Sequence, residues 1–255
     1  MSLLVPRSPT STADWIRCPL AYTLKREWRA RGGIWTPNQL LGTAIGDGLS
    51  ELYRGGSDPE EVVRRALSEG YIPNDTWELS ALVKLALRGY ERASQEELHR
   101  EGDVLMVDEP LPSRARPDLV QRTPHGIVVT DTKVTLKGGF RYVDEYFTSH
   151  QLFHYAWEVG EVLGEPVKWC RIHLISLTPL QTLLHPIEIR PERLALWLEG
   201  AKRVWDEMGT QTPTARFTGC QTRYGPCEFR DACHVLDLDP DRMESVYERV
   251  PPREI

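Results

Sequence analysis

The hydrophobic pattern of the chain changes near Gly102, and this change restricts the folds that are open to it. Over residues 76–100 apolar side chains recur at helical spacing. After Gly102 come three short β-rich segments separated by Pro and Gly turns, DVLMVDEPL, RPDLVQR and GIVVTDTK. The order predicts a helical first part followed by an antiparallel meander, which is an α/β arrangement.

Further elements are expected on both sides of this change. Ser11 is placed to cap a helix that runs to about residue 30, and Ser149 to cap one that runs to about residue 163. The other predicted elements are helices over 37–55, 59–69 and 191–208 and strands in VKWCRIHLISL and QTLLHPIEI. We expect three segments that form one structural unit: an N-terminal helical lobe (1–101), a core (102–209) and a cysteine-rich segment of irregular structure (210–255).

The composition favours a globular intracellular protein. Of the 255 residues 40% are hydrophobic and 27% charged, which is typical of a folded chain. The net charge is −6, so any contact with nucleic acid must come from local basic patches. We find no signal peptide and no window that would span a membrane, and we expect a cytoplasmic protein.

The end of the predicted strand GIVVTDTK carries an acid and a base. Asp131 and Lys133 are two residues apart, so on a strand they project from one face, and a hairpin would bring Asp118 alongside. Two neighbouring carboxylates repel each other unless a divalent cation lies between them, and Mg²⁺ prefers oxygen ligands. This set suits metal-assisted phosphodiester hydrolysis. The alternative is an exposed strand end with an Asp–Lys ion pair of little consequence.

These residues resemble the motifs of the PD-(D/E)XK nuclease superfamily. Pro117-Asp118 matches the PD element and Asp131-Thr132-Lys133 matches the (D/E)XK element at the end of a strand. Gln151 and Tyr155 match the Gln-x-x-x-Tyr motif that the RecB-type branch places on the following helix. The resemblance implies a restriction-endonuclease-like core, with a central mixed sheet flanked by helices.

The resemblance also implies a role for each residue. Asp118, Asp131 and the Thr132 backbone carbonyl would hold Mg²⁺ or Mn²⁺, and Lys133 would orient the attacking water. Gln151 and Tyr155 would position substrate or Lys133. The implied activity is that of a deoxyribonuclease, in particular an exonuclease on single-stranded DNA or DNA ends.

One position departs from the family pattern. RecB-type nucleases carry a histidine ligand on an early helix, after a Gly-x-x-apolar run. In the matching stretch, GTAIGDGLSEL, Gly46 stands where the histidine is expected. Asp47 or Glu51 is a candidate substitute, and weaker metal binding or loss of catalysis are the other interpretations.

Four of the five cysteines have a spacing that favours a metal centre. Cys18 lies near the N-terminus and Cys220, Cys227 and Cys233 near the C-terminus. The arrangement resembles the [4Fe–4S] staple of AddB-type and CRISPR-associated nucleases, which would tie the helical lobe to the C-terminus. Structural zinc and unlinked thiols are the alternatives. Cys170 lies within a predicted strand and is expected in the core.

Basic residues near the motifs are candidates for DNA contacts. Arg114 and Arg116 flank the PD element, and Lys137 and Arg141 follow the (D/E)XK strand. The stretch KREWRAR at 25–31 is a candidate for a DNA contact and, equally, for a solvated helix face.

Two other classes of function stay open at this point. One is a non-catalytic DNA-binding or assembly subunit that retains the fold and the cluster. The other is a cluster-bearing accessory protein whose Asp–Lys pair is structural. By resemblance, the DNA and protein partners would be those of recombination, repair, CRISPR adaptation or phage DNA processing.

Overall fold

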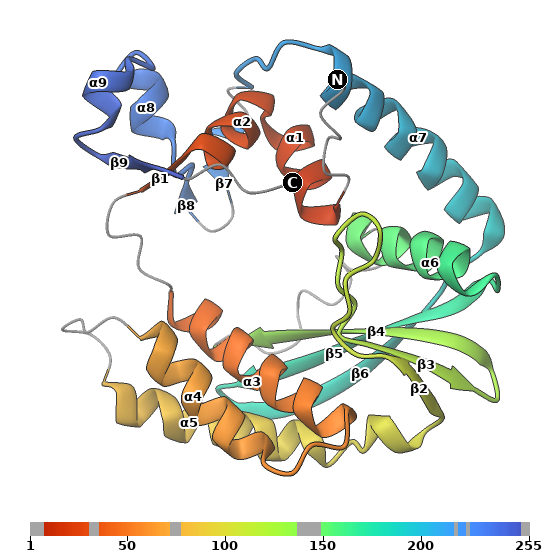
Figure 1. Cartoon of the computed structure of the whole chain (residues 1–255). Helices are drawn as coiled ribbons and strands as arrows, with labels where there is room; N and C mark the ends of the chain where they lie inside the picture. The colour runs from red at the N-terminus through yellow and green to blue at the C-terminus, as the bar shows by residue number, and fades with distance from the viewer. Residues whose placement is uncertain are drawn as a thin grey trace. The chain divides into compact units, whose positions relative to one another are not determined.

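The computed structural model describes residues 8–30, 36–71, 78–136, 149–216, 219–222 and 225–250. The chain forms two compact units, one of Ile34–Trp197 and one of Met1–Gly33 with Leu198–Ile255. The unit boundaries therefore follow residues 33 and 197, whereas the sequence-based segments meet at 101–102 and 209–210. The first unit contains the sheet together with the helices that pack on it (Figure 1).

A five-stranded sheet forms the centre of the first unit. Its order is β2-β3-β4-β5-β6, with β4 and β5 parallel and the other neighbours antiparallel. The strands are β2 (Asp103–Met106), β3 (Leu119–Thr123), β4 (Gly126–Thr135), β5 (Val167–Leu177) and β6 (Leu180–Glu188). The strands β2, β3 and β4 form an antiparallel meander, and a crossover then places β5 parallel to β4. This arrangement confirms the predicted α/β core with a mixed sheet flanked by helices.

Three helices lie on one side of this sheet (Figure 1). They are α3 (Pro37–Tyr53), α4 (Pro59–Gly70) and α5 (Leu79–Ser94), followed by the 3₁₀ turn η1 (Leu98–Arg100). Of these helices, α3 and α5 pack on the strands, and α4 packs on the other two. Thr36 and Gln39 form a capping box at the start of α3, and Asp58 caps α4. The buried side chains Ile45 and Leu82 belong to the same hydrophobic cluster as Ile175 of the sheet.

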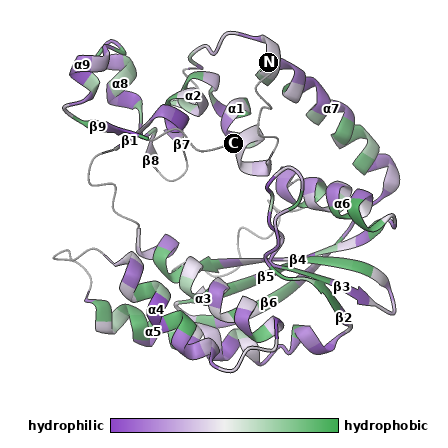
Figure 2. Ribbon diagram, in the orientation of Figure 1, coloured by the Kyte–Doolittle hydropathy of each residue, from purple (hydrophilic) through white to green (hydrophobic). Residues whose placement is uncertain are grey.

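The helix α6 (His150–Leu163) covers the other face and connects β4 to β5. Its buried residues Leu152 and Val159 pack with Val129 and Ile172 of the sheet. Figure 2 shows hydrophobic stretches on the strands of the sheet, interrupted by hydrophilic residues. The helix ends at Gly164, whose φ of 66° is a left-handed conformation that favours glycine.

The second unit is built from both ends of the chain. Its elements are α1 (Pro9–Arg17), α2 (Pro19–Glu27), β1 (Trp28–Ala30), most of α7 (Pro191–Thr210), β7 (Gln221–Thr222), β8 (Gly225–Pro226), α8 (Arg230–His234), α9 (Pro240–Met243) and β9 (Tyr247–Arg249). The strands β1 and β9 pair antiparallel, so the two ends of the chain meet in one small sheet.

Two sequence-based expectations for this unit were wrong. The single helix from Ser11 to about residue 30 is divided at Cys18, whose extended backbone (φ −163°) precedes Pro19, and its cap is Ser8. Proline disfavours helical geometry in the residue before it, which explains the break. The segment expected to be irregular after residue 210 contains short helices and strands, and its last strand, β9, pairs with β1 from the other end of the chain.

Candidate active site

The hairpin of β3 and β4 brings Asp118 beside the end of the active-site strand. Leu119 pairs with Thr130, so Asp118, the residue before β3, lies opposite Asp131. The backbone N–H of Thr132 donates a hydrogen bond of 2.5 Å to Asp118 Oδ2. The expected proximity of Asp118 to the (D/E)XK strand is therefore present in the structure.

The charge of Asp131 affects the ionisation of Asp118. Burial, and after it the charge of Asp131, raise the pKa of Asp118 to about 7, while the Thr132 N–H and the Lys133 charge act in the opposite direction. The side chain of Asp131 is only 3% exposed. This burial excludes the interpretation of an exposed strand end with a solvated ion pair.

Lys133 projects from the same face of β4 as Asp131. Its Nζ lies 2.8 Å from Asp131 Oδ2 and donates a hydrogen bond of 3.0 Å to Gln151 Oε1. The lysine is 30% exposed, whereas its partner carboxylate is buried. The ammonium group is thus held between a strand and a helix, with part of its surface accessible.

The helix α6 supplies the next contacts. Gln151 Nε2 donates to the hydroxyl of Tyr155 at 2.8 Å, and this hydroxyl donates to the carbonyl of Arg116 at 2.9 Å. Burial, followed by the charge of Asp131, raises the pKa of the Tyr155 phenol, so it stays protonated and able to donate. A continuous chain of contacts therefore joins the lysine to the loop that precedes Asp118.

A cavity of about 260 Å³ opens beside Asp118. It is lined by Asp118 and Thr132 from the hairpin, by Asp108, and by five residues of α3: Gly42, Thr43, Gly46, Asp47 and Ser50. A Cβ added at Gly46 would meet no atom within 4 Å, so this helix position borders open space.

Of the two acids considered as substitutes for the missing histidine, Asp47 lines this cavity. Glu51 is not among the described residues that do so. Burial and the charge of Asp108 raise the pKa of Asp47. Asp108 was not singled out from the sequence, because nothing in its local pattern predicts where the β2–β3 loop returns to the site.

The donor set at the hairpin suits a hard divalent cation. Asp118 and Asp131 offer carboxylate oxygens whose mutual repulsion a cation would relieve, and oxygen donors are those that Mg²⁺ and Mn²⁺ prefer. Within the described ranges, no group of three or more His, Cys, Asp or Glu side chains is arranged to hold a metal ion. The fit therefore rests on the two carboxylates.

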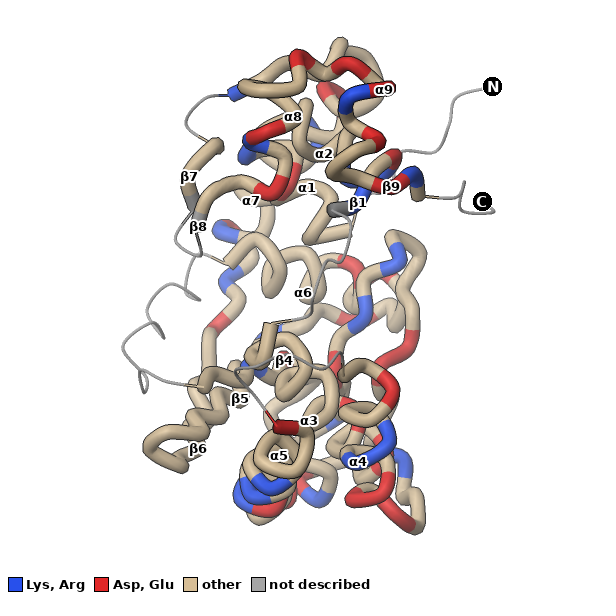
Figure 3. Tube along the Cα trace, turned by 90° about the vertical axis from the view of Figure 1, so that its left-hand side faces the viewer, with Lys and Arg blue, Asp and Glu red and all other residues tan. Residues whose placement is uncertain are grey.

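The predicted DNA-contacting arginines lie at the surface beside the site. Arg116 is 57% exposed and its Nη1 lies 3.7 Å from Asp108 Oδ2. Arg114 is exposed and has a φ of 67°. Lys137 and Arg141 lie outside the described residues. On α4 basic and acidic residues are interspersed (Figure 3), whereas α5 carries Lys84, Arg88 and Arg92 at i, i+4 spacing.

The four candidate cluster cysteines all belong to the second unit. Burial, and then the charges of Cys227, Cys18 and Cys220, raise the pKa of the Cys233 thiol. The four cysteines are all among the described residues, and there they form no group of side chains arranged to hold a metal ion. Cys18, Cys227 and Cys233 also contribute to one hydrophobic cluster. The thiols are free, and their donor chemistry suits iron or zinc. Cys170 is fully buried in the core, as predicted.

His234 follows Cys233 in the sequence and was interpreted from that position as incidental to the cluster, but it lies beside another of these thiols. Its Nε2 is 3.7 Å from Cys220 Sγ.

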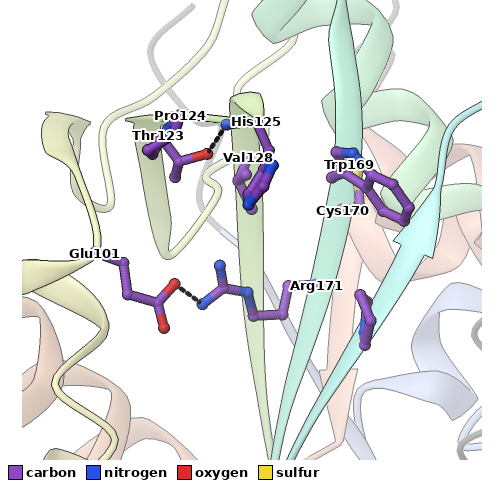
Figure 4. A pocket seen from close by; sticks show the side chains of 9 residues that line it. Glu101, Thr123, Pro124, His125, Val128, Trp169, Cys170 and Arg171 are labelled. Atoms are coloured by element: carbon purple, nitrogen blue, oxygen red, sulfur yellow. Dashed lines mark hydrogen bonds and ion pairs between the residues drawn. The ribbon is translucent and has the colours of Figure 1, made fainter.

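A larger pocket, of about 590 Å³, lies elsewhere in the first unit and contains none of the predicted site residues (Figure 4). Arg171 and Glu101 point toward one another across it, with 2.8 Å between Nη1 and Oε2, and Trp169 forms part of its wall.

Comparison with known proteins gives one informative match. The family model of the PD-(D/E)XK nuclease superfamily matches residues 6–234. A search of curated proteins gave no match. Among solved structures, one titled "Crystal structure of SSO0001" has 16% sequence identity and a TM-score of 0.31, over 75% of this chain and 84% of that one. A likeness at this level carries no weight for the site. No helix among the described residues is long and apolar enough to cross a membrane.

Proposed function

The chain belongs to the PD-(D/E)XK nuclease superfamily, and we propose that it is a metal-dependent deoxyribonuclease of the RecB-type branch, acting as an exonuclease on single-stranded DNA or DNA ends. The observation that carries this proposal is the position of Lys133. Its ammonium group lies between the buried carboxylate of Asp131 and the amide of Gln151, next to a second acid, Asp118.

Each residue has a chemical role in this proposal. Asp118, Asp131 and the Thr132 carbonyl would hold Mg²⁺ or Mn²⁺, which when bound supplies positive charge to a phosphate oxygen and lowers the pKa of a water. Lys133 orients the attacking water and stabilises negative charge that develops on the phosphate. Gln151 fixes the lysine side chain, and Tyr155 fixes the loop that leads into Asp118.

The basic residues at the surface would guide the nucleic acid. Arg114 and Arg116 are exposed beside Asp118 and are suited to contact phosphates. We extend this role to Lys137 and Arg141 from their sequence positions alone. The branch assignment suggests work in recombination, repair, CRISPR adaptation or phage DNA processing, in the cytoplasm and with the protein partners of one of those processes.

We further propose that Cys18, Cys220, Cys227 and Cys233 hold a [4Fe–4S] cluster with a structural role, zinc being the alternative. The electrostatic influence of three of these thiols on the fourth supports a common centre. A metal centre there would link residues from both ends of the chain, and its binding free energy would add to the stability of the fold.

A second candidate function follows from the open space at Gly46. A protein that lacks the histidine ligand of its branch would bind a cation more weakly, and it could serve as a non-catalytic DNA-binding or assembly subunit. Such a subunit would bind DNA ends without degrading them, and Asp131→Ala would leave its function intact.

Crystals soaked in Mn²⁺ separate the two candidates. The nuclease proposal expects an anomalous peak between the carboxylates of Asp118 and Asp131, and loss of that peak in Asp131→Ala. Absence of a peak in the unaltered protein would contradict the proposal.

A further inference from the structure

The loop between β2 and β3 delivers Asp118 to the site, and its shape is held from within. Leu111 N–H donates to the Ala115 carbonyl at 2.8 Å, and Arg114 N–H donates to the Leu111 carbonyl at 2.7 Å. The side chains of Leu111 and Ala115 are buried in the hydrophobic cluster that α6 shares with the sheet. The loop therefore has a fixed turn just ahead of Pro117 and Asp118.

A buried carboxylate on α6 contacts this turn. Glu158 is 5% exposed, and it accepts a hydrogen bond of 2.6 Å from the Ser113 N–H and one of 2.5 Å from the Ser113 hydroxyl. Burial alone would raise the pKa of Glu158, but the hydrogen bonds from His154 and Ser113 outweigh it and hold the pKa below its ordinary value. An ionised acid thus lies beneath the turn at neutral pH.

His154 completes the arrangement. It is fully buried, and its Nε2 lies 2.9 Å from Ser113 Oγ and 3.2 Å from Glu158 Oε2. Since the serine hydroxyl donates to Glu158, its oxygen accepts from the histidine Nε2–H and from the Ala115 N–H at 3.2 Å. Every polar group of Ser113 that faces α6 is therefore engaged.

This trio of Ser113, His154 and Glu158 is not arranged as an activated nucleophile. In such a triad the acid contacts the histidine nitrogen that faces away from the serine. Here Glu158 contacts the same nitrogen that faces Ser113, and it also binds the serine hydroxyl directly. The contacts hold the loop and do not form the relay of acid, histidine and serine that activates a nucleophile.

The helix α6 thus contacts the active site and its loop through two pairs of residues at i, i+4 spacing. Gln151 and Tyr155 reach Lys133 and the Arg116 carbonyl, while His154 and Glu158 reach Ser113. The loop is fixed to α6 at positions 113 and 116, only a few residues before Asp118.

We propose that Ser113, His154 and Glu158 are positioning residues that hold Asp118 against Asp131 before a cation binds. Two neighbouring carboxylates repel each other, so without an anchor the loop would move Asp118 away, and binding would have to restore its position. A fixed loop removes that requirement and raises cation affinity, as outer-shell partners do at other metal sites. This inference rests on the proposed metal site of the nuclease.

The test measures Mn²⁺ binding to the full-length protein without DNA, by isothermal titration calorimetry above pH 7. Glu158→Gln keeps the size of the side chain but removes its charge, and we expect Mn²⁺ affinity to fall about 10- to 100-fold. Hydrogen exchange should speed up at the amides of Ser113 and Ala115. The matched control is Glu161→Gln, an exposed acid on the same helix, which should bind like the unaltered protein.

The possible outcomes distinguish the positioning role of the three residues from the metal site itself. If Glu158→Gln folds and binds Mn²⁺ as the unaltered protein does, the positioning role is wrong while the metal site stands. If the unaltered protein binds no Mn²⁺, or Asp118→Asn binds it equally well, the metal site of the proposed function is wrong. If Glu158→Gln does not fold, Ser113→Ala carries the same test, since it removes the hydroxyl and keeps the Ser113 N–H bond to Glu158. Unchanged affinity in that variant overturns the inference.

Discussion

Lys133 Nζ donates a hydrogen bond of 3.0 Å to Gln151 Oε1, which joins the active-site strand to α6. Among the described residues, the side chain of Gln151 is hydrogen-bonded to Lys133 and Tyr155, so its influence on the two aspartates passes through the lysine. The contact fixes the direction of a long and flexible side chain that would otherwise sample many rotamers.

Removal of this contact should reduce the rate more than the stability. We expect Gln151→Ala to lower kcat for DNA cleavage by about 10- to 100-fold, since small displacements of a catalytic group cost this much. Steady-state cleavage assays measure the effect, with the exposed Gln95→Ala as control. Unchanged kcat would show that the amide does not position the lysine.

Cation binding should depend on pH because Asp118 holds a proton until about pH 7. Below that value a cation must displace the proton, so Mn²⁺ affinity should fall up to about tenfold for each pH unit between 7 and 5 and level off above 7. Calorimetric titrations across this range give the slope. In Asp118→Asn the slope should disappear, and its persistence would assign the proton to another group.

The raised pKa of Asp118 also makes the free energy of unfolding depend on pH. The ordinary pKa of an aspartate is 3.8 and the folded value for Asp118 is about 7, so between these values the folded protein holds a proton that the unfolded chain releases. The contribution of Asp118 to the free energy of unfolding of the metal-free protein therefore decreases as pH rises through this window.

Gly46 should tolerate a side chain. Because a Cβ there meets nothing within 4 Å, Gly46→Ala should stabilise the helix by up to about 1 kcal/mol in urea unfolding. Gly46→His should raise Mn²⁺ affinity if the position is that of the missing ligand. Gly48→Ala is the contrasting control, since its Cβ would lie 2.5 Å from Val63 Cγ2 and should destabilise the protein. Equal effects at 46 and 48 would contradict this account.

The cysteine proposal predicts a coloured protein. Anaerobically purified protein should contain iron with broad visible absorbance, and Cys18→Ser should lose iron and lower the melting temperature. Metal analysis together with thermal unfolding provides the measurement. Cys170→Ala, which alters a thiol in the core of the first unit, should retain the iron. A colourless protein with bound zinc would show that the four cysteines hold zinc and not an iron–sulfur cluster.

The sequence alone predicted the parts of the site that follow from local periodicity. The hairpin placed Asp118 beside Asp131, and i, i+4 spacing placed Gln151 and Tyr155 on one side of α6, because strand and helix geometry act over a few residues. The break at Cys18 could have been predicted from the proline that follows it.

The remaining features depend on contacts between distant residues. Ser113 meets Glu158, and β1 pairs with β9, only after the whole fold has formed. Their local sequences contain no signal of these partners. The cavity at Asp118 likewise combines residues of α3 with Asp108 and the hairpin, which no single motif includes.

The nuclease proposal is best tested by cleavage of end-labelled single- and double-stranded DNA, with and without Mn²⁺, by the unaltered protein and by Lys133→Ala. We expect cleavage that requires the metal and falls at least about 100-fold in the variant, because the lysine stabilises charge on the phosphate. The exposed Lys168→Ala should cleave normally. Absence of metal-dependent cleavage by the unaltered protein, or equal cleavage by Lys133→Ala, would contradict the proposal.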